Sequence, residues 1–309
     1  MSELREALDG VLEGVAPARL ADSVQRLIAD YRSGRPAGEP LLRTMVDVTA
    51  YAAYRMPATH AAVTAVLRNL PSIQPRSLLD VGGGTGAAAW AASEVYGPLA
   101  TTVLDQVPEA LKLGQRIAAG RDIAWQQWRL GEQLPDADLV TVSYVLGELT
   151  DDDQEALTAG AAQAARQAVV FIEPGTPLGY RRILSARQQL VATGWSIAAP
   201  CPHQERCGMT GTDWCHFSAR VNRSALHRRL KEAQLGYEDE KFSYVAATRQ
   251  ATAAAGRVVR HPGFRKGLVT LQVCRPDTTV GPVLVSKREG PVYKAARDAE
   301  WGDRWPPHD

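Results

Sequence analysis

One stretch, from Ser77 to Gly97, limits the possible folds of this chain more than any other. It reads as a buried strand (SLLDV), a turn with four glycines in five residues (GGGTG) and an alanine-rich helix that should begin near Thr85. Glycines at the end of a strand let backbone N–H groups approach a ligand, because no side chain intervenes. The stretch therefore predicts an adenosine-type binding site at the first turn of an α/β domain.

Strands and helices alternate from this stretch up to residue 192. We expect strands over residues 77–81, 101–105, 123–130, 137–149 and 167–175, and helices that begin at Pro108, Asp151 and Pro177. Such alternation predicts an α/β fold with a doubly wound, Rossmann-like parallel sheet and helices on both faces. Before it, residues 3–31 and 41–70 carry apolar side chains at helical spacing, which predicts a helical N-terminal module that covers the sheet domain.

The residues around the glycine turn indicate which ligand to expect. Asp80, Gly82, Gly84 and Gly86 form the pattern D-x-G-x-G-x-G, and Asp105 ends the second expected strand. A carboxylate at that position can accept hydrogen bonds from both hydroxyls of a ribose. The glycines also satisfy the dinucleotide pattern G-x-G-x-x-G/A, which leaves a nicotinamide cofactor open. With its leading aspartate, however, the motif resembles the first motif of class I S-adenosylmethionine methyltransferases, and this favours S-adenosylmethionine.

No catalytic base is evident from the sequence. Glu148 lies at the end of the fourth expected strand and could line the pocket, or cap the next helix. Glu173 ends the fifth strand in the sequence Glu-Pro-Gly-Thr, whereas methyltransferases that act on exocyclic amines commonly carry Asn/Asp-Pro-Pro-aromatic there. Turnover therefore has no residue assigned to it.

The four cysteines predict a metal centre. Cys201, Cys207 and Cys215 lie in the stretch CPHQERCGMTGTDWC, and Cys274 is the fourth. Turn-forming proline and glycine residues between them allow thiolates to converge on one point. The spacing C-x5-C-x7-C leaves zinc and an iron–sulfur cluster both open. We expect residues 267–274 to form an antiparallel strand that closes the core sheet and brings Cys274 to the other three.

Two other interpretations of the cysteines are buried free thiols and disulfides. Disulfides are disfavoured because the N-terminus, MSELREALDG, has no apolar signal segment, which predicts a reducing, cytoplasmic location. No apolar run approaches the roughly 20 residues that a membrane span needs, so no membrane association is expected.

The charge is unevenly divided along the chain. Residues 1–219 have a net charge of −6 and residues 220–309 a net charge of +7, within a total of +1. A one-sided basic region favours a polyanionic partner, and nucleic acid is the leading candidate, with a solvated basic surface as the alternative. The residues predicted to contact RNA are Arg228, Arg229, Lys287, Arg288 and Lys294.

Several segments of the sequence resemble those of a known protein family. LLDVGGGTG, SYVLGEL, EPGTPLGYRRILSAR, CPH, DWCHFSARV, EDEKFSYV and KREGPVYKAARDAEWGDRWP occur in this order. They resemble the methyltransferase-like family of mitochondrial small-ribosomal-subunit assembly factors, which has bacterial members. The resemblance implies a class I methyltransferase fold, S-adenosylmethionine at the glycine turn and a [4Fe–4S] cluster on Cys201, Cys207, Cys215 and Cys274.

The resemblance also implies association with the small ribosomal subunit and its RNA, by a protein that is monomeric off the ribosome. Three functions are compatible with these features: an S-adenosylmethionine-dependent enzyme acting on ribosomal RNA, a non-catalytic assembly factor that binds immature RNA, and a nicotinamide oxidoreductase with an iron–sulfur centre. The expected division of the chain is a helical module over residues 1–72, an S-adenosylmethionine-binding core over 73–199, and a cysteine-cluster and basic RNA-facing region over 200–309, which includes the last core strands.

Overall fold

The computed structural model describes residues 2–13, 15, 17–33, 44–70, 73–222, 236–250 and 255–307. The predicted helix over residues 224–234, which carries Arg228 and Arg229, lies outside the described residues. Within the described part of the chain, no helix combines the length and apolar character required to cross a membrane.

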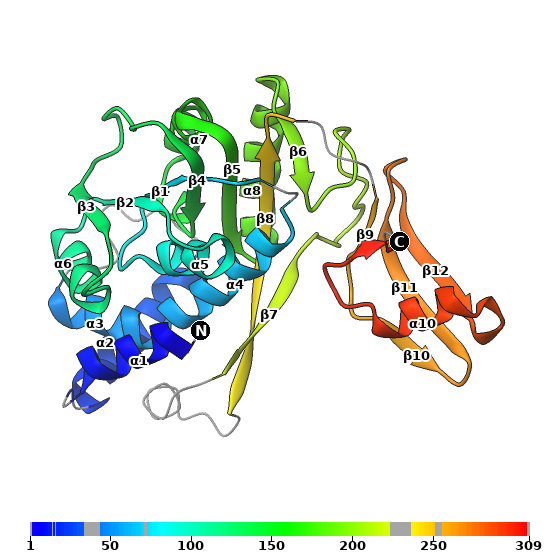
Figure 1. The fold of residues 1–309 in the computed structure, drawn as a ribbon, viewed down its shortest axis with the longest axis horizontal. Coiled ribbons are helices and arrows are strands. Elements are labelled where there is room, and N and C mark those ends of the chain that lie inside the picture. The colour runs from blue at the N-terminus through cyan, green and yellow to red at the C-terminus, as the bar shows by residue number, and fades with distance from the viewer. Residues whose placement is uncertain are drawn as a thin grey trace.

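The larger of two sheets has eight strands in the order β3-β2-β1-β4-β5-β8-β6, with β7 paired to β8 (Figure 1). The strands are β1 Ser77–Val81, β2 Ala100–Asp105, β3 Ile123–Gln127, β4 Ala137–Ser143, β5 Ala165–Pro174, β6 Ser196–Ala199, β7 Phe217–Asn222 and β8 Tyr237–Thr248. The first five are parallel, and β8 runs antiparallel to β5, β6 and β7. The predicted Rossmann-like fold is thus confirmed, although the sheet is mixed rather than wholly parallel.

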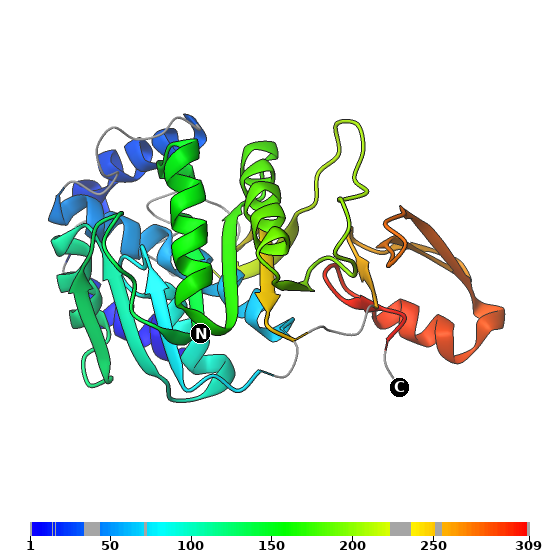
Figure 2. The same cartoon turned by 90° about the horizontal axis from the view of Figure 1, so that it is seen from above.

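Helices cover both faces of this sheet (Figure 2). They are α4 Met56–Arg68, α5 Ala87–Tyr96, α6 Pro108–Ile117, α7 Asp151–Ala164 and α8 Pro177–Ala192. Apolar residues of α4 and α5 form one core layer with the sheet, and those of α7 and α8 form the other. Thr150 and Thr176 start α7 and α8 by accepting hydrogen bonds from the backbone N–H groups of Asp153 and Gly179, as N-cap residues do.

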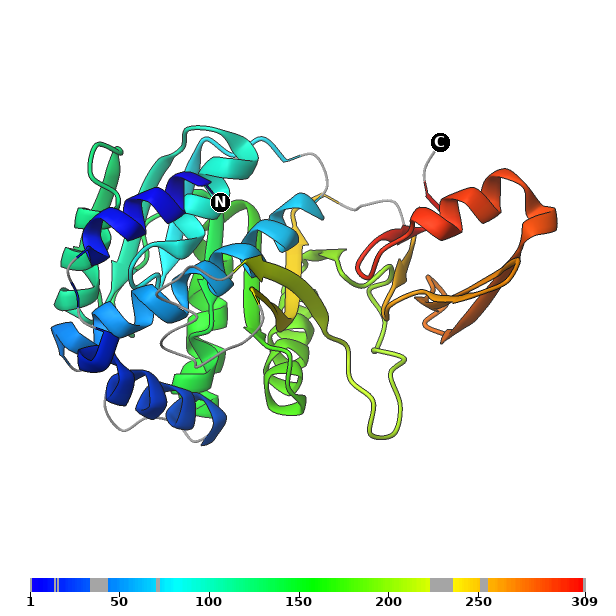
Figure 3. The same ribbon diagram turned by 90° about the horizontal axis from the view of Figure 1, so that it is seen from below.

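The N-terminal helices are α1 Ser2–Leu12, α2 Pro17–Ser33 and α3 Met45–Tyr54. Leucines at positions 4, 8 and 12 recur once per helical turn and are buried with Leu113 and Ile117 of α6. Thr44 and Asp47 form a capping box at the start of α3. The described N-terminal helices pack against α5 and α6 of the sheet domain, as Figure 3 shows from below.

A second, smaller sheet follows near the C-terminus. Its antiparallel strands are β9 Gly256–Val258, β10 Gly263–Arg265, β11 Leu268–Cys274, β12 Val280–Ser286 and β13 Arg304–Trp305. The short helix α10, Pro291–Asp298, covers one face through Ala296, which shares a buried core with Val269, Leu271 and Val273 of β11.

Two sequence-based expectations were wrong. The strand that ends at Cys274 does not close the main sheet, because β11 pairs with β9, β10 and β12, and β8 already has strands on both of its edges. The fourth strand ends at Ser143 rather than at 149, because Tyr144 has a φ of +61° and turns the chain into a 3-10 turn, Leu146–Glu148.

Candidate functional site

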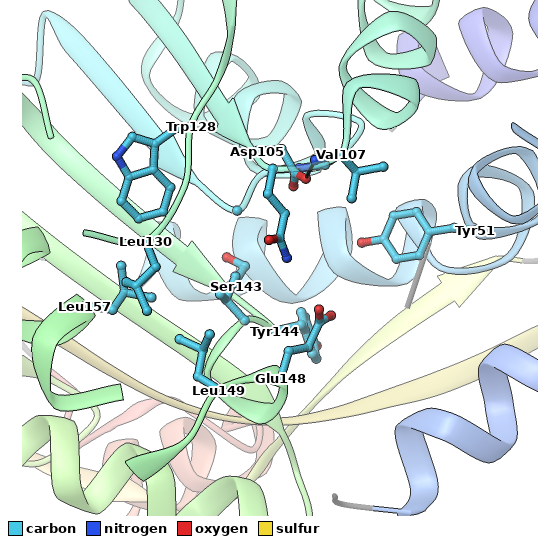
Figure 4. Close-up of a pocket in the computed structure, with 14 residues that line it drawn as sticks. Tyr51, Asp105, Val107, Trp128, Leu130, Ser143, Tyr144, Glu148, Leu149 and Leu157 are labelled. Atoms are coloured by element: carbon cyan, nitrogen blue, oxygen red, sulfur yellow. Dashed lines mark hydrogen bonds between the residues drawn. The ribbon is translucent and has the colours of Figure 1, made fainter. Parts of the chain in front are cut away.

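A pocket lies at the carboxyl ends of β1, β2 and β4, where the strand order reverses between β1 and β4. Open sheets of this kind bind ligands at that point. The empty space of the pocket is about 770 Å³, including its open mouth. Its lining residues are Tyr51, Gly82, Gly84, Asp105, Gln106, Val107, Trp128, Leu130, Ser143, Tyr144, Val145, Glu148, Leu149 and Leu157 (Figure 4).

The glycine turn has the backbone geometry that its sequence predicts. Gly82, Gly84 and Gly86 all have positive φ, between +55° and +84°. Gly86 precedes α5, and a Cβ atom there would lie 2.7 Å from the indole ring of Trp125. Glycine is therefore required at this position for both conformation and space.

Asp105 joins the glycine turn to the end of β2. Its carboxylate accepts hydrogen bonds from the backbone N–H groups of Gly84 and Val107, both at 2.8 Å. Burial raises the pKa of Asp105, and the backbone hydrogen bonds oppose that rise. The structure thus brings together three residues that the sequence analysis selected for one site: Gly82, Gly84 and Asp105 line the same pocket.

Asp80 does not line the pocket but lies beneath the turn. One oxygen accepts a hydrogen bond from the Thr141 hydroxyl at 2.8 Å, and the other, Oδ2, has no hydrogen-bond partner among the described residues. A Cβ atom on Gly83 would lie 2.4 Å from Oδ2. Asp80 therefore supports the turn from below, and burial raises its pKa to about 7.

Asp80 should make the ligand-free protein less stable at higher pH. The folded chain holds this proton more tightly than the unfolded chain, so the free energy of unfolding falls as pH rises from 3.8 to about 7. Asp80→Asn keeps the size and the Thr141 hydrogen bond, and should remove the part of that decline that falls between pH 5 and about pH 7, which is about 3 kcal/mol. Urea unfolding at pH 5 and pH 8 measures it. An unchanged pH dependence would contradict the assignment, and the exposed Asp136→Asn is the control.

The pocket is acidic. Glu148 lines it, as expected, and burial together with the nearby Asp105 and Glu173 raises its pKa to about 8. Figure 4 shows the Glu148 carboxylate and the Tyr51 hydroxyl directed toward the middle of the pocket. Among the described lining residues there are two carboxylates and no lysine, arginine or histidine.

Glu173 faces inward rather than toward the pocket mouth. Its Oε1 atom accepts a hydrogen bond from the backbone N–H of Leu146 at 3.0 Å, and Oε2 lies 3.6 Å from the guanidinium of Arg182. Burial raises the pKa of Glu173 to about 7. Glu173 therefore fixes the 3-10 turn after β4, which carries Glu148.

The sequence analysis missed a network beside the pocket. The Tyr144 hydroxyl donates to Glu240 on β8 at 2.9 Å, and Arg55, between α3 and α4, makes two hydrogen bonds of 2.9 Å to the same carboxylate. Arg55 also lies over the Tyr144 ring. The family words include SYVLGEL and EDEKFSYV, which contain Tyr144 and Glu240, but no local pattern relates the two residues.

The four cysteines lie on two separate parts of the chain. Residues 200–216 form no helix or strand and connect β6 to β7, and this segment carries Cys201, Cys207 and Cys215, whereas Cys274 ends β11. Burial and the charges of the other three thiols raise the pKa of Cys215, and burial with Cys201 and Cys207 raises that of Cys274 to about 12. All four thiols are free, so no disulfide joins them.

The described residues do not form a compact single-ion site. No three of the described His, Cys, Asp or Glu side chains are grouped as one metal ion requires. His203, two residues after Cys201, has its Nε2 atom 3.8 Å from Cys274 Sγ. The segment that carries three of the cysteines therefore passes next to the fourth.

The predicted RNA contacts are placed in part. Lys287 and Arg288 form the 3-10 turn after β12, Lys287–Glu289, and Lys294 lies on α10; all three are exposed. The Lys287 N–H donates to Gly267 O at 2.8 Å, which sets this turn against the β10–β11 hairpin. Arg228 and Arg229 lie outside the described residues, so no structural statement applies to them.

The hairpin adds residues that the sequence analysis did not select. Arg265 and Lys266 are exposed at its end, and the neighbouring Phe264 is 60% exposed. We call Arg265, Lys266, Lys287 and Arg288 the basic tip.

The strand order, the glycine turn and the carboxylate after β2 together define a Rossmann-like domain of the class I methyltransferase type. The chain belongs to the family described as "Mitochondrial small ribosomal subunit Rsm22", which matches residues 45–306.

Curated relatives agree with this family. The human "Ribosome assembly protein METTL17, mitochondrial" is 27% identical over 287 residues, which cover 83% of this chain and 62% of the relative. The "Rsm22-cox11 tandem protein 2, mitochondrial" of Schizosaccharomyces pombe is 23% identical over 338 residues, covering 88% of this chain and 45% of the relative. The chain thus spans about half to three fifths of the length of these relatives.

Solved methyltransferase structures resemble the chain only distantly. An O-methyltransferase family protein from Burkholderia thailandensis aligns with a TM-score of 0.46 at 13% identity, covering 74% of this chain and 69% of that one. The magnesium protoporphyrin IX methyltransferase of Synechocystis, with bound SAH, gives 0.41 at 14% identity, covering 72% and 94%. The fold assignment therefore rests on the strand order and not on these scores.

The comparisons overturn one prediction. The absence of an apolar N-terminal segment led to the expectation of a cytoplasmic location, but the matching family and the curated relatives are mitochondrial proteins. The inference failed because a missing secretory segment argues against secretion and does not distinguish the remaining compartments.

Proposed function

We propose that this chain is an S-adenosylmethionine-binding factor of small-ribosomal-subunit assembly. It carries a [4Fe–4S] cluster on Cys201, Cys207, Cys215 and Cys274, and it binds ribosomal RNA through its basic C-terminal region. Its membership of the Rsm22 family and the assembly role named for its human relative support the partner. The charge of the pocket is the observation that supports the ligand.

S-adenosylmethionine carries a positive sulfonium, whereas a nicotinamide dinucleotide carries an anionic diphosphate. The described lining of the pocket offers Asp105 and Glu148 and no cationic side chain. A carboxylate-lined site attracts the sulfonium and repels the diphosphate. The charge therefore favours S-adenosylmethionine over the nicotinamide cofactor that the glycine pattern alone leaves open.

Calorimetry with each ligand tests this choice. S-adenosylmethionine and its demethylated product should bind, and NAD should not. Because bound sulfonium stabilises the charged form of Glu148, whose pKa is raised to about 8, binding should release protons near neutral pH. Tight binding of NAD with no binding of S-adenosylmethionine would overturn the proposal.

Within this function, we favour ligand binding over methyl transfer. Glu173 ends β5, at the position where amine methyltransferases commonly carry their Asn/Asp-Pro-Pro-aromatic motif. Its carboxylate is occupied by the Leu146 N–H group and by Arg182, and it fixes the 3-10 turn after β4. Incubation of labelled S-adenosylmethionine with small subunits from a deletion strain should therefore transfer no label to RNA. Stoichiometric labelling would show that the protein is an enzyme.

The cysteine group fits a cluster better than a zinc ion. Four thiolates around one zinc ion have Zn–S distances of about 2.3 Å, which places their sulfur atoms about 4 Å from one another. Among the described residues the cysteines do not group around one point, although their segment reaches Cys274 through His203. A [4Fe–4S] cluster suits this wider arrangement, because each thiolate binds a different iron. When bound, it would act as a covalent cross-link between the two sheets.

Anaerobic purification with metal and sulfide analysis tests the cluster. We expect iron and acid-labile sulfide in equal amounts, and little zinc. Stoichiometric zinc without iron would overturn the cluster and leave the proposed pocket ligand unaffected.

The basic tip is the part of the described surface that best suits RNA. Its four cations can contact phosphates, and the exposed ring of Phe264 beside them can stack on an unpaired base.

Reversing two charges of the basic tip should weaken RNA binding. Lys287→Glu with Arg288→Glu should lower the affinity for small-subunit ribosomal RNA fragments at least about 10-fold, and reduce the slope of log K against log salt by about 2. Filter binding over a salt series measures both. Lys112→Glu with Arg116→Glu, on the exposed side of α6, is the matched control. Equal losses in the two pairs would contradict a specific role for the tip.

A further inference from the structure

Two arginines are buried without an acidic partner. Arg187 on α8 and Arg257 on β9 are each 3% exposed. Within the described residues, neither guanidinium forms an ion pair with a carboxylate, and the oxygen atoms that accept their hydrogen bonds are all neutral. A buried charge without a counter-charge costs several kcal/mol. The structure therefore calls for an anion near both side chains.

Both arginines hold the segment that carries the cysteines. Arg187 donates to His203 O and Glu205 O, both at 2.8 Å, and its Nε has no partner among the described residues. Arg257 donates a hydrogen bond of 3.1 Å to the carbonyl oxygen of Pro200, which is the residue before Cys201.

Arg257 also reaches two further elements. It donates to Asn69 Oδ1 at the end of α4 and to Gly302 O before β13, both at 2.8 Å. The guanidinium thus lies where the first sheet domain, the cysteine segment and the second sheet meet.

The thiols are the acidic groups that lie near both arginines. Arg257 is the cross-strand partner of Cys274 in the β9–β11 pairing, and it donates to the carbonyl oxygen next to Cys201. Arg187 holds the same segment a few residues further along. Arg260 provides a contrast, because it is near Cys215 but has its own carboxylate partner in Asp213. The two guanidiniums, which have no carboxylate partner among the described residues, thus lie beside the segment of Cys201 and the end of β11 at Cys274.

We propose that Arg187 and Arg257 are positioning residues whose fixed charges neutralise the four-cysteine centre, retain it in the protein and raise its reduction potential. The inference rests on the proposed cluster. An oxidised [4Fe–4S] centre with four thiolates carries two net negative charges and gains a third when it accepts one electron. Two buried guanidiniums match the oxidised charge, and they favour the reduced form relative to a neutral environment.

Substitutions that separate charge from hydrogen bonding test the proposal. Arg187→Gln and Arg257→Gln keep a donor for the carbonyl groups but remove the charge, and Arg187→Lys and Arg257→Lys keep both. Each protein is isolated anaerobically and analysed for iron and sulfide. It is then titrated with dithionite, monitored by electron paramagnetic resonance, and exposed to an iron chelator.

We expect the glutamine variants to have a more negative reduction potential and to lose iron about 10-fold faster or more, and the lysine variants to stay close to wild type. The exposed Arg220→Gln is the control, since Arg220 pairs with Asp239 on the sheet surface. Equal losses in glutamine and lysine variants, or an unchanged potential in both glutamine variants, would overturn the inference. If one glutamine variant does not fold, the other arginine provides the same comparison.

The metal content of the wild-type protein distinguishes failure of the arginine inference from failure of the cluster proposal. A wild type with neither iron nor zinc would refute the cluster and the inference together. A wild type with zinc would refute the cluster only, and the order of chelation rates among the variants would still decide the role of the arginines.

Discussion

Replacing Asp105 with alanine should lower the affinity for S-adenosylmethionine by about 100-fold or more. In the proposed complex its carboxylate accepts both ribose hydroxyls, and hydrogen bonds to a charged acceptor contribute about 1.5–3 kcal/mol each. The substitution also removes the acceptor for the Gly84 and Val107 N–H groups, which fixes the glycine turn. Calorimetry on the purified variant measures the loss.

Two comparisons make the Asp105 result specific. Asp105→Asn keeps the shape and one acceptor oxygen, so its loss of affinity should be smaller than that of alanine. Asp136→Ala removes an exposed carboxylate just before β4, at the amino ends of the strands and away from the pocket, and should leave binding unchanged. Wild-type affinity in Asp105→Ala would refute the location of the ribose and with it the proposed pocket.

Replacing Cys274 with serine should remove the cluster and destabilise the protein by about 4 kcal/mol. Loss of the cross-link frees the loop from Cys215 to Cys274, and chain entropy for a closed loop of that length gives this magnitude. Iron analysis and urea unfolding of the anaerobic protein measure both effects.

The other cysteines provide the control for Cys274. If the cysteines were only small buried residues, Cys274→Ser should cost most, because Cys274 is 7% exposed and the other three cysteines are only half-buried. A shared centre predicts instead that each substitution removes the iron and lowers stability to a similar degree. A graded series that follows burial, with iron unaffected, would contradict the cluster.

The main sheet was predictable because its signals are local. The central parallel strands are short apolar runs that end in turns, and some helices carry their own start signal, such as Thr176 before Pro177. The second sheet was not predictable in the same way. The alternation of Val269, Leu271 and Val273 specifies that one face of β11 is buried, but it does not specify which helix or sheet buries it. Only the structure shows that α10 does so.

The same distinction explains what the sequence revealed of the site. Gly82, Gly84 and Asp105 follow strand ends, so the fold rule that places strand ends together was sufficient. Tyr144 and Glu240 are far apart in the chain and meet only because β8 passes beside β5. Arg257 contributes to the positive net charge of residues 220–309, although it is buried. A count of charges does not record burial, so the sequence could not distinguish it from the exposed basic residues.

The long strand β8 belongs to two environments along its length. Residues 242–248 all pair with β5, and Phe242 and residues 246–248 also have a partner in β7 or β6 on the other side, whereas residues 237–241 pair with β7 alone. Backbone amides in the first group should therefore exchange with deuterium far more slowly than those in the second. The boundary falls next to Glu240, so the carboxylate that holds Tyr144 at the pocket lies where protection from exchange begins to fall.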